Sequence, residues 1–342
     1  MNKFLPKLIY INSKQLLLIF LFLLVLVFSI LISIVTGSFK ISINDIFNGQ
    51  LSDIAKSVFY EIRLPRVIFA AFVGCALSLS GACLQGLFRN PLADPGLIGV
   101  SSGAALGAAS IIVLGSNFIP DFLLGPYLVP LSAIIGAMFV IFLLYSFTSG
   151  FGYQGITYML LAGIAVNSIA GVAIGILTYI SDDAALRSLT FWTMGSFGGI
   201  TWHLAIPAIT IIILNLIWIF RFSRKLDIIQ LGESEAYRLG IDVKKLKFSV
   251  IISSAIIVGI SVSISGMIGF VGLIVPHLIR LIGGVNHNYL LPSSALGGAI
   301  LMVISDLISR TIVEPAELPI GLITSAIGSP FFLWLILKTK RI

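Results

Sequence analysis

The chain has 342 residues, of which 58% are hydrophobic and only 10% are charged. Soluble globular domains carry roughly 25% charged residues, so this composition excludes a solvated globule. The sequence contains no Gly-Lys dipeptide and therefore no Walker A loop, and its three histidines lack metal-ligand spacing. We expect no enzyme active site, no metal site and no cofactor in this chain.

Apolar runs recur along the chain, and about ten of them are long enough to cross a bilayer as helices. The expected spans are approximately 15–36, 65–86, 93–115, 127–148, 155–180, 201–221, 248–268, 270–284, 293–310 and 320–338. The first run is expected to be a retained span, with a cleaved signal peptide as the alternative. The predicted fold is therefore an all-α polytopic membrane protein, with one transmembrane domain over residues 1–342.

Basic residues predict how the chain is oriented. If the N-terminus is cytoplasmic, 15 of the 21 lysines and arginines fall on the cytoplasmic side, as the positive-inside rule requires. Both termini and the polar segment 221–247 are then cytoplasmic. The excess of positive charge is explained by topology alone and indicates a lipid bilayer, with no nucleic acid as a partner.

The polar segment 221–247 is the longest polar stretch of the chain. Its centre, Leu231 to Gly240 (LGESEAYRLG), is predicted to form a short helix bracketed by two glycines. Because the flanking runs are apolar enough to lie in lipid, this segment must face water. A water-facing helix between two spans is where a membrane protein would meet a soluble partner.

Two copies of a short pattern indicate an internal repeat. Ser78-Leu79-Ser80-Gly81 is followed by Pro91, and Ser263-Ile264-Ser265-Gly266 is followed by Pro276, a shift of 185 residues in both elements. The copies are expected to end the second and seventh spans, so an offset of five spans would relate the two halves by inverted topology, a transporter trait. The alternative is a chance match of a common small-residue pattern.

The stretch from Arg89 to Ala104 combines two prolines with small residues. Pro91 and Pro95 disfavour helix at the residues before them, and Asp94 is placed to cap a new helix that begins at Pro95. The glycines that follow permit close approach of backbones; they are Gly96, Gly99, Gly103 and Gly107. Two interpretations stay open, a transport-pathway lining and a tight turn followed by ordinary helix packing.

Arginines are expected just outside the membrane on the side opposite the polar segment. Arg63 and Arg66 precede or begin the second span, and Arg310 follows the ninth. The guanidinium fork grips carboxylates at two points, so these residues could dock an acidic partner. The alternative is that they anchor helix ends at the lipid headgroups.

Six ordered blocks together resemble the FecCD family, the permeases of binding-protein-dependent ABC importers for iron–siderophores, heme and cobalamin. They are RLPR from Arg63, SGACLQGLFRNPLADPGLIGVSSGA, FWTMGS from Phe191, LGESEAYRLG, GFVGLIVPHLIR from Gly269, and PAELPIG from Pro315. The resemblance implies the type II ABC importer permease fold in the cytoplasmic membrane. It also implies a homodimer with a second copy, two separate ATP-binding subunits and an extracytoplasmic substrate-binding protein.

The resemblance also implies roles for particular residues. It assigns ATPase coupling to Leu231, Gly232, Glu233, Glu235, Ala236, Arg238, Leu239 and Gly240. It assigns docking of the binding protein to Arg63, Arg66 and Arg310. It places a pathway or gate at Asn90, Pro91, Asp94, Pro95, Gly99, Ser101, Ser102 and Gly103.

The block NPLADPGLIGVSSGAALGA, with WTMGS and the pair Gly198-Gly199, looks most similar to heme permeases. Heme is therefore the expected cargo, with a ferric siderophore or cobalamin as the alternatives. An ion-coupled secondary transporter is the alternative from another class. That class usually needs ionisable groups near the bilayer midplane, and Asp306 is the only acidic residue well inside a predicted span.

Overall fold

The computed structural model describes residues 11–37, 39, 48, 52–118, 125, 127–148 and 155–339. Within these ranges all regular structure is helical. Seven helices there are long and apolar enough to cross a membrane by length and composition, and three shorter apolar helices accompany them. These ten helices match the predicted spans in number and order, so the all-α polytopic prediction is confirmed.

The ten apolar helices are α1 (Ser13–Val35), α4 (Leu64–Phe88), α5 (Val100–Phe118), α6 (Leu128–Thr148), α7 (Gly155–Ile180), α9 (Trp202–Phe220), α12 (Val243–Ser265), α13 (Val271–Gly283), α14 (His287–Ser309) and α15 (Ile320–Thr339). The shorter elements are α3 (Asp53–Ser57), η1 (Val58–Arg63), η2 (Pro95–Ile98), α8 (Asp183–Met194), α10 (Ser223–Ile229) and α11 (Glu233–Arg238).

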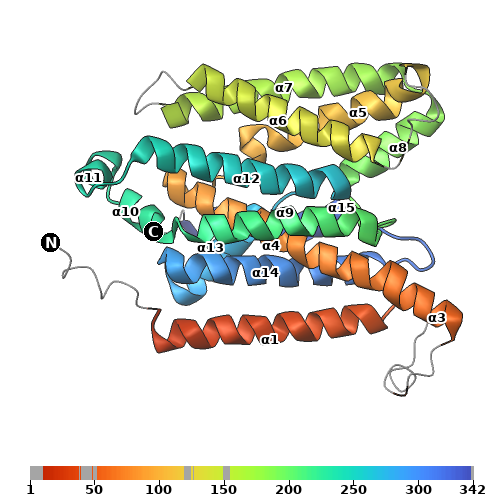
Figure 1. The fold of residues 1–342 in the computed structure, drawn as a ribbon, viewed down its shortest axis with the longest axis horizontal. Helices are drawn as coiled ribbons and strands as arrows, with labels where there is room; N and C mark the ends of the chain where they lie inside the picture. Colours follow the sequence, from red (N-terminus) through yellow and green to blue (C-terminus); the bar gives the residue numbers. More distant parts are fainter. Residues whose placement is uncertain are drawn as a thin grey trace.

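The apolar helices run side by side along the long axis of the molecule (Figure 1). Helix α1 lies at one edge, and α5, α6 and α7 form the opposite edge. Helix α1 begins and α15 ends at the end of the bundle that carries α10 and α11, whereas α3 and α8 lie at the other end. The polar segment, the start of α1 and the end of α15 therefore lie at the same end of the bundle, as the distribution of basic residues predicts.

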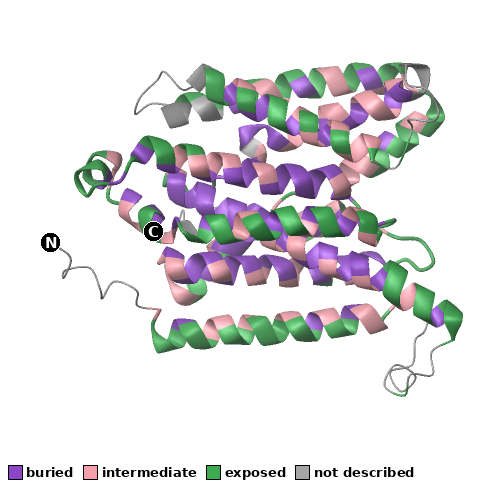
Figure 2. Cartoon of the chain, in the orientation of Figure 1, coloured by how far each residue is buried: buried purple, intermediate pink, exposed green. Residues whose placement is uncertain are grey.

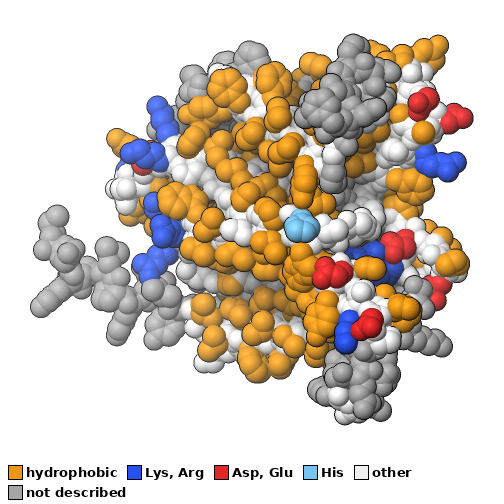
Figure 3. Space-filling model, turned by 45° about the vertical axis from the view of Figure 1, so that its right-hand side comes forward, with side chains coloured by type: hydrophobic (Ala, Val, Ile, Leu, Met, Phe, Trp, Pro, Cys, Tyr) orange, Lys and Arg blue, Asp and Glu red, His pale blue; other side chains and the backbone are white. Residues whose placement is uncertain are grey.

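The surface of the bundle is what a lipid environment requires. Figure 3 shows a broad area of hydrophobic side chains between two ends that carry the charged ones. Exposed apolar residues are especially frequent on α1 and α7. Among the 18 most apolar consecutive residues of each helix, only 17% in α1 and 11% in α7 are buried. This pattern identifies the sides of the bundle as the surface that faces lipid or another membrane-embedded chain.

The buried centre of the bundle is built on α4 and α14 (Figure 2). Their backbones touch, because a Cβ added at Gly74 would lie 2.1 Å from the carbonyl oxygen of Gly298, and one added at Gly298 would lie 2.1 Å from that of Gly74. Lipid tails are as apolar as side chains, so close backbone packing of this kind replaces the hydrophobic effect as the force that holds membrane helices together.

Several predicted span boundaries differ from the structure, and the second and ninth spans show why. The second predicted span starts near residue 65, but helix runs without a break from Asp53 through η1 into α4, with Ser52 as its N-cap. The ninth predicted span starts near residue 293, but α14 begins at His287 because Asn286 caps it, and Pro292 lies inside the helix. Proline and caps shift such boundaries by several residues without changing the number of spans.

The two copies of the short repeat pattern have different structural roles. The prediction that its first copy ends a span is wrong, because Ser78–Gly81 lies inside α4, which continues to Phe88. A Cβ at Gly81 would stand 1.9 Å from the carbonyl oxygen of Gly272, so this glycine serves helix contact. Gly266 instead ends α12 with φ +71. The inverted relation of the two halves stays a prediction.

Candidate functional site

The predicted helix at the centre of the polar segment is present. Helix α11 spans Glu233–Arg238, between Gly232 with φ +116 and Gly240 with φ +83. Both glycines have positive φ, which side chains disfavour, so they define where the helix starts and stops. This local sequence folds as expected because its glycines take the conformations that only glycine takes readily.

Helix α11 and the residues that flank it present an exposed apolar surface. Leu231, Tyr237 and Leu239 are 67%, 71% and 60% exposed, whereas Ala236 is fully buried against the core. The position of Ala236 fixes which face of α11 points outward. Large exposed apolar side chains on a charged, water-facing segment are typical of a surface that a protein partner covers.

The charged residues of the segment divide into two groups. Lys247 Nζ contacts Glu233 Oε2 at 2.7 Å, and both side chains are largely buried, at 15% and 12% exposed. This pair ties α11 to the start of α12. Glu235 and Arg238 form an exposed pair at 2.9 Å and face outward. Glu233 therefore holds α11 in place, whereas Glu235 and Arg238 remain accessible.

Helix α10, which precedes α11, was not predicted. Leu226 and Ile229 are fully buried in the core of the bundle, and Asp227 contacts the start of α14. The spacing of three between the two apolar residues was the available signal. The neighbouring basic residues obscure this signal, because they make the segment polar on average.

The broken segment after α4 has the predicted local chemistry. Asp94 Oδ1 accepts the backbone N–H of Gly96 at 2.7 Å and caps η2, with Pro95 at its first position. Gly99 follows with φ +84. The Asn90 side chain accepts the backbone N–H of Leu92 at 2.9 Å. The prediction of a break and a new helix start is confirmed, although the new helix is a single 3-10 turn.

Asn167, on α7, holds this segment and was missed by sequence reasoning. Its Nδ2 donates to the carbonyl oxygen of Gly96 at 3.2 Å, and its Oδ1 accepts from the Ser102 hydroxyl at 2.6 Å. A lone asparagine in an apolar helix was the signal, because buried amides in membranes need partners. Of the predicted pathway residues, Asp94, Pro95, Gly99 and Ser102 gather around this connection, and Ser101 adjoins it.

The close packing expected of the glycines is found at two of them. A Cβ at Gly103 would stand 2.5 Å from the carbonyl oxygen of Gly136, and one at Gly107 would stand 2.1 Å from that of Ser132. Both bring α5 against α6. An apolar cleft of about 630 Å³ opens between α5, α6 and α7, and Gly103 is the one predicted pathway residue that lines it. Asn90 and Pro91 are exposed in the turn beside the polar segment.

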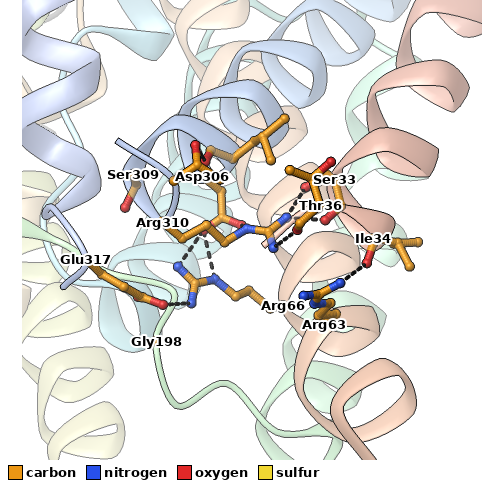
Figure 4. A network of polar contacts seen from close by, with 12 residues as sticks. Ser33, Ile34, Thr36, Arg63, Arg66, Gly198, Asp306, Ser309, Arg310 and Glu317 are labelled. Atoms are coloured by element: carbon orange, nitrogen blue, oxygen red, sulfur yellow. Dashed lines mark hydrogen bonds and ion pairs between the residues drawn. The ribbon is translucent and has the colours of Figure 1, made fainter. Parts of the chain in front are cut away.

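The three predicted docking arginines lie together at the other end of the bundle (Figure 4). Arg66 contacts Asp306 Oδ1 at 2.8 Å and Glu317 Oε1 at 2.8 Å. Arg310 Nε lies 3.4 Å from Asp306 Oδ2. Asp306 is fully buried. It therefore stands between two guanidinium groups and belongs to a charged network that links α4, α14 and the loop before α15.

Two of these arginines bind the last turn of α1. Arg63 donates to the carbonyl oxygens of Ile34 and Val35 at 2.9 and 2.7 Å, and also to that of Phe39. Arg310 donates to Thr36 O at 2.7 Å and to Ser33, whose hydroxyl lies at 2.7 Å.

All three arginines are buried; Arg63, Arg66 and Arg310 are 5%, 6% and 8% exposed. They are not free cationic side chains, because each guanidinium already has partners within the chain.

The comparisons with known proteins agree with this architecture. The FecCD transport family matches residues 24–338. The hemin transport system permease protein HmuU of Yersinia pestis is 45% identical over 305 residues, which cover 89% of this chain and 90% of the relative. The vitamin B12 import system permease protein BtuC of Salmonella typhi is 41% identical over 282 residues, covering 82% and 84%.

One solved structure is similar throughout. It is described as an inward-facing conformation of a metal-chelate type ABC transporter, with a TM-score of 0.84, 34% identity, and coverage of 94% of this chain and 98% of that chain. The chain belongs to the FecCD transport family. It is a multi-pass membrane protein and a transport subunit rather than an enzyme.

Proposed function

We propose that the chain is the membrane-spanning permease subunit of an ATP-driven importer in the cytoplasmic membrane, with both termini and α11 on the cytoplasmic side. In this proposal it pairs with a second copy, two ATPase subunits bind at the cytoplasmic face, and a binding protein delivers cargo outside. The observation that carries the proposal is the exposed apolar surface of Leu231, Tyr237 and Leu239, which lie on and beside α11, a helix that the Lys247–Glu233 pair ties to the bundle.

Heme is the cargo that the relatives favour, because the hemin permease is more similar to this chain than the cobalamin permease, at 45% against 41% identity. A ferric siderophore or cobalamin is the alternative. Heme is largely apolar, and the cleft between α5, α6 and α7 is lined by apolar and small residues. Import of such a cargo requires no ligand to its metal from the permease.

The coupling role falls on the residues from Leu231 to Gly240. Leu231 and Leu239 would enter an apolar groove on the ATPase, and Glu235 and Arg238 would pair with charges at its rim. Ala236 and Glu233 would hold the helix on the permease, and Gly232 and Gly240 would fix its ends. A rigidly held helix transmits movement of the ATPase instead of absorbing it.

The gate proposal rests on the segment from Asn90 to Gly103. Asn167 joins this segment to α7, whose exposed apolar face is suited to a second membrane-embedded chain. Movement at the interface between two copies would reach η2 through that connection. Asp94, Pro95 and Gly99 would then form the moving part, with Ser101, Ser102 and Gly103 on the helix that follows, and Asn90 and Pro91 at its cytoplasmic end.

An ion-coupled transporter fits this structure less well. Asp306 is the only acidic residue predicted well inside a span, and it is paired with Arg66 and Arg310. This carboxylate is fully buried and already engaged by two guanidinium groups, so it has no contact with water through which it could exchange a proton during transport.

The proposal is tested by reconstituting the permease with its ATPase and binding protein in liposomes and measuring ATP-dependent heme uptake. Tyr237→Ser is expected to weaken ATPase binding about 10-fold or more, as loss of an interfacial tyrosine does, and to lower uptake accordingly. Tyr127→Ser changes an exposed tyrosine at the start of α6 and is the matched control. Uptake without ATP, or unchanged ATPase binding by Tyr237→Ser, would refute the proposal; uptake of cobalamin in preference to heme would refute only the cargo.

Docking of the binding protein is expected to displace Glu317. This residue is the exposed partner of Arg66, with its side chain 44% exposed, while Asp306 is inaccessible. Glu317→Gln is therefore expected to strengthen binding of the binding protein about 5-fold, equivalent to ~1 kcal/mol. Glu314→Gln removes the same charge from the same loop and is the control. Surface plasmon resonance with the permease in nanodiscs measures the affinity for the binding protein. Equal effects of the two substitutions on this affinity would show that docking does not displace Glu317 from Arg66.

A further inference from the structure

The start of α14 meets the polar segment and the end of α4 at one point. Asp227 Oδ1 accepts the backbone N–H of His287 at 2.9 Å and lies 2.6 Å from His287 Nδ1. The His287 side chain is 4% exposed. Its Nε2 faces Gly86 on α4, where an added Cβ would stand only 2.4 Å away. We call Asp227, His287 and Gly86 the clasp.

Two further hydrogen bonds fix α10 beside the clasp. Gln230 Nε2 donates to the carbonyl oxygen of Gly86 at 2.6 Å, and the Ser223 hydroxyl donates to Asn288 Oδ1 at 2.9 Å. Figure 1 shows α10 next to the beginning of α14. Helix α10 is thus bound to both α4 and α14 by side chains as well as by its buried apolar residues.

The helices that the clasp joins are also fastened to each other elsewhere. Gly74 and Gly298 bring their backbones into contact in mid-helix. At the far end, Arg66 of α4 contacts Asp306 of α14. The α4–α14 pair is therefore fixed at three places along its length. It joins α10 at one end of the bundle to the arginine network, formed by Arg66, Arg310 and Asp306, at the other. Packed elements of this kind move as rigid bodies.

We infer that Asp227 and His287 are positioning residues that pass movement from the polar segment to the far face through the α4–α14 pair. The far face is the end of the bundle that carries Arg63, Arg66 and Arg310. The inference rests on the proposed function. Helix α11 reaches the bundle through α12 by way of the Lys247–Glu233 pair, and the clasp supplies a second connection. With both connections intact, α11 and the far face move together; without the clasp, ATP hydrolysis continues but moves the far face less.

The test measures cargo transported per ATP hydrolysed by the complete importer in liposomes. Asp227→Ala removes the acceptor and is expected to lower this ratio about 5-fold or more. Asp227→Asn keeps an acceptor for the backbone N–H and for Nδ1–H, so it is expected to stay within about 2-fold of the unsubstituted protein. Gly86→Ala pushes against the His287 ring and is expected to lower the ratio too, while Gly125→Ala, with no atom within 4 Å of the added Cβ, leaves it unchanged.

A merely structural role predicts another outcome. Loss of folded importer lowers transport and hydrolysis together and leaves their ratio unchanged, which would overturn the inference. An equal loss in Asp227→Asn and Asp227→Ala would overturn it as well. If the proposed function itself is wrong, the unsubstituted chain shows no ATP-dependent uptake, so the two failures are distinguishable.

Discussion

Replacing Asp306 with asparagine is expected to destabilise the folded chain by about 3–5 kcal/mol, the cost of removing one partner from a buried ion pair. Asp306 is fully buried and lies between Arg66 and Arg310. Without its charge, Arg66 would keep Glu317 as its one carboxylate partner, and Arg310 would lose the carboxylate that it contacts. Thermal unfolding of the purified protein in detergent measures the loss as a lower transition temperature.

The control for Asp306→Asn is Asp53→Asn. Asp53 also pairs with a basic residue, Lys56 at 3.4 Å, but its side chain is fully exposed. Exposed pairs contribute little to stability because water already solvates both charges. The control should therefore unfold at the temperature of the unsubstituted protein. If Asp306→Asn does the same, the arginine network does not stabilise the fold.

Replacing Gly298 with alanine is expected to cost about 1–3 kcal/mol, towards the upper end because the obstacle is backbone. The added Cβ would stand 2.1 Å from the Gly74 carbonyl oxygen and 2.5 Å from the Ser78 Cβ. Neither atom can rotate away, so α4 and α14 would have to separate. The same unfolding experiment measures this, and expression in the membrane fraction should fall in parallel.

Gly175→Ala is the matched control for Gly298→Ala. It adds the same methyl group to an apolar helix, α7, where no atom lies within 4 Å. Alanine favours helix over glycine by about 1 kcal/mol, so this substitution should preserve or raise stability. Equal losses at Gly175 and Gly298 would show that contact between the two backbones contributes nothing.

Sequence reasoning predicted the number and order of the apolar helices because hydrophobicity over 18 residues needs no tertiary information. It also predicted the ends of α11, since Gly232 and Gly240 act locally, and the cap at Asp94. The environment of the arginines could not be predicted. Burial of Arg66 depends on Asp306, which is 240 residues away in the chain, and no local pattern records that contact.

Helix α10 and Asn167 show a second limit. Both were overlooked because their neighbours dominate the local composition, basic residues around α10 and apolar ones around Asn167. Their roles follow from partners in α14 and η2. The coupling, docking and gating residues therefore stay predictions about function, although the structure describes where each of them lies.

The hydrogen bonds from Arg63 and Arg310 fasten α1, which lies at the edge of the bundle, to the rest of the fold. The last carbonyl groups of a helix have no partner within it, and its C-terminus carries partial negative charge. The two guanidinium groups cap α1 from outside, at Ser33, Ile34, Val35 and Thr36. Removing α1 would take from Arg63 its acceptors at Ile34 and Val35 and would leave Arg310 with Asp306 alone. The first apolar run is therefore an integral part of the folded protein, which disfavours its removal as a signal peptide.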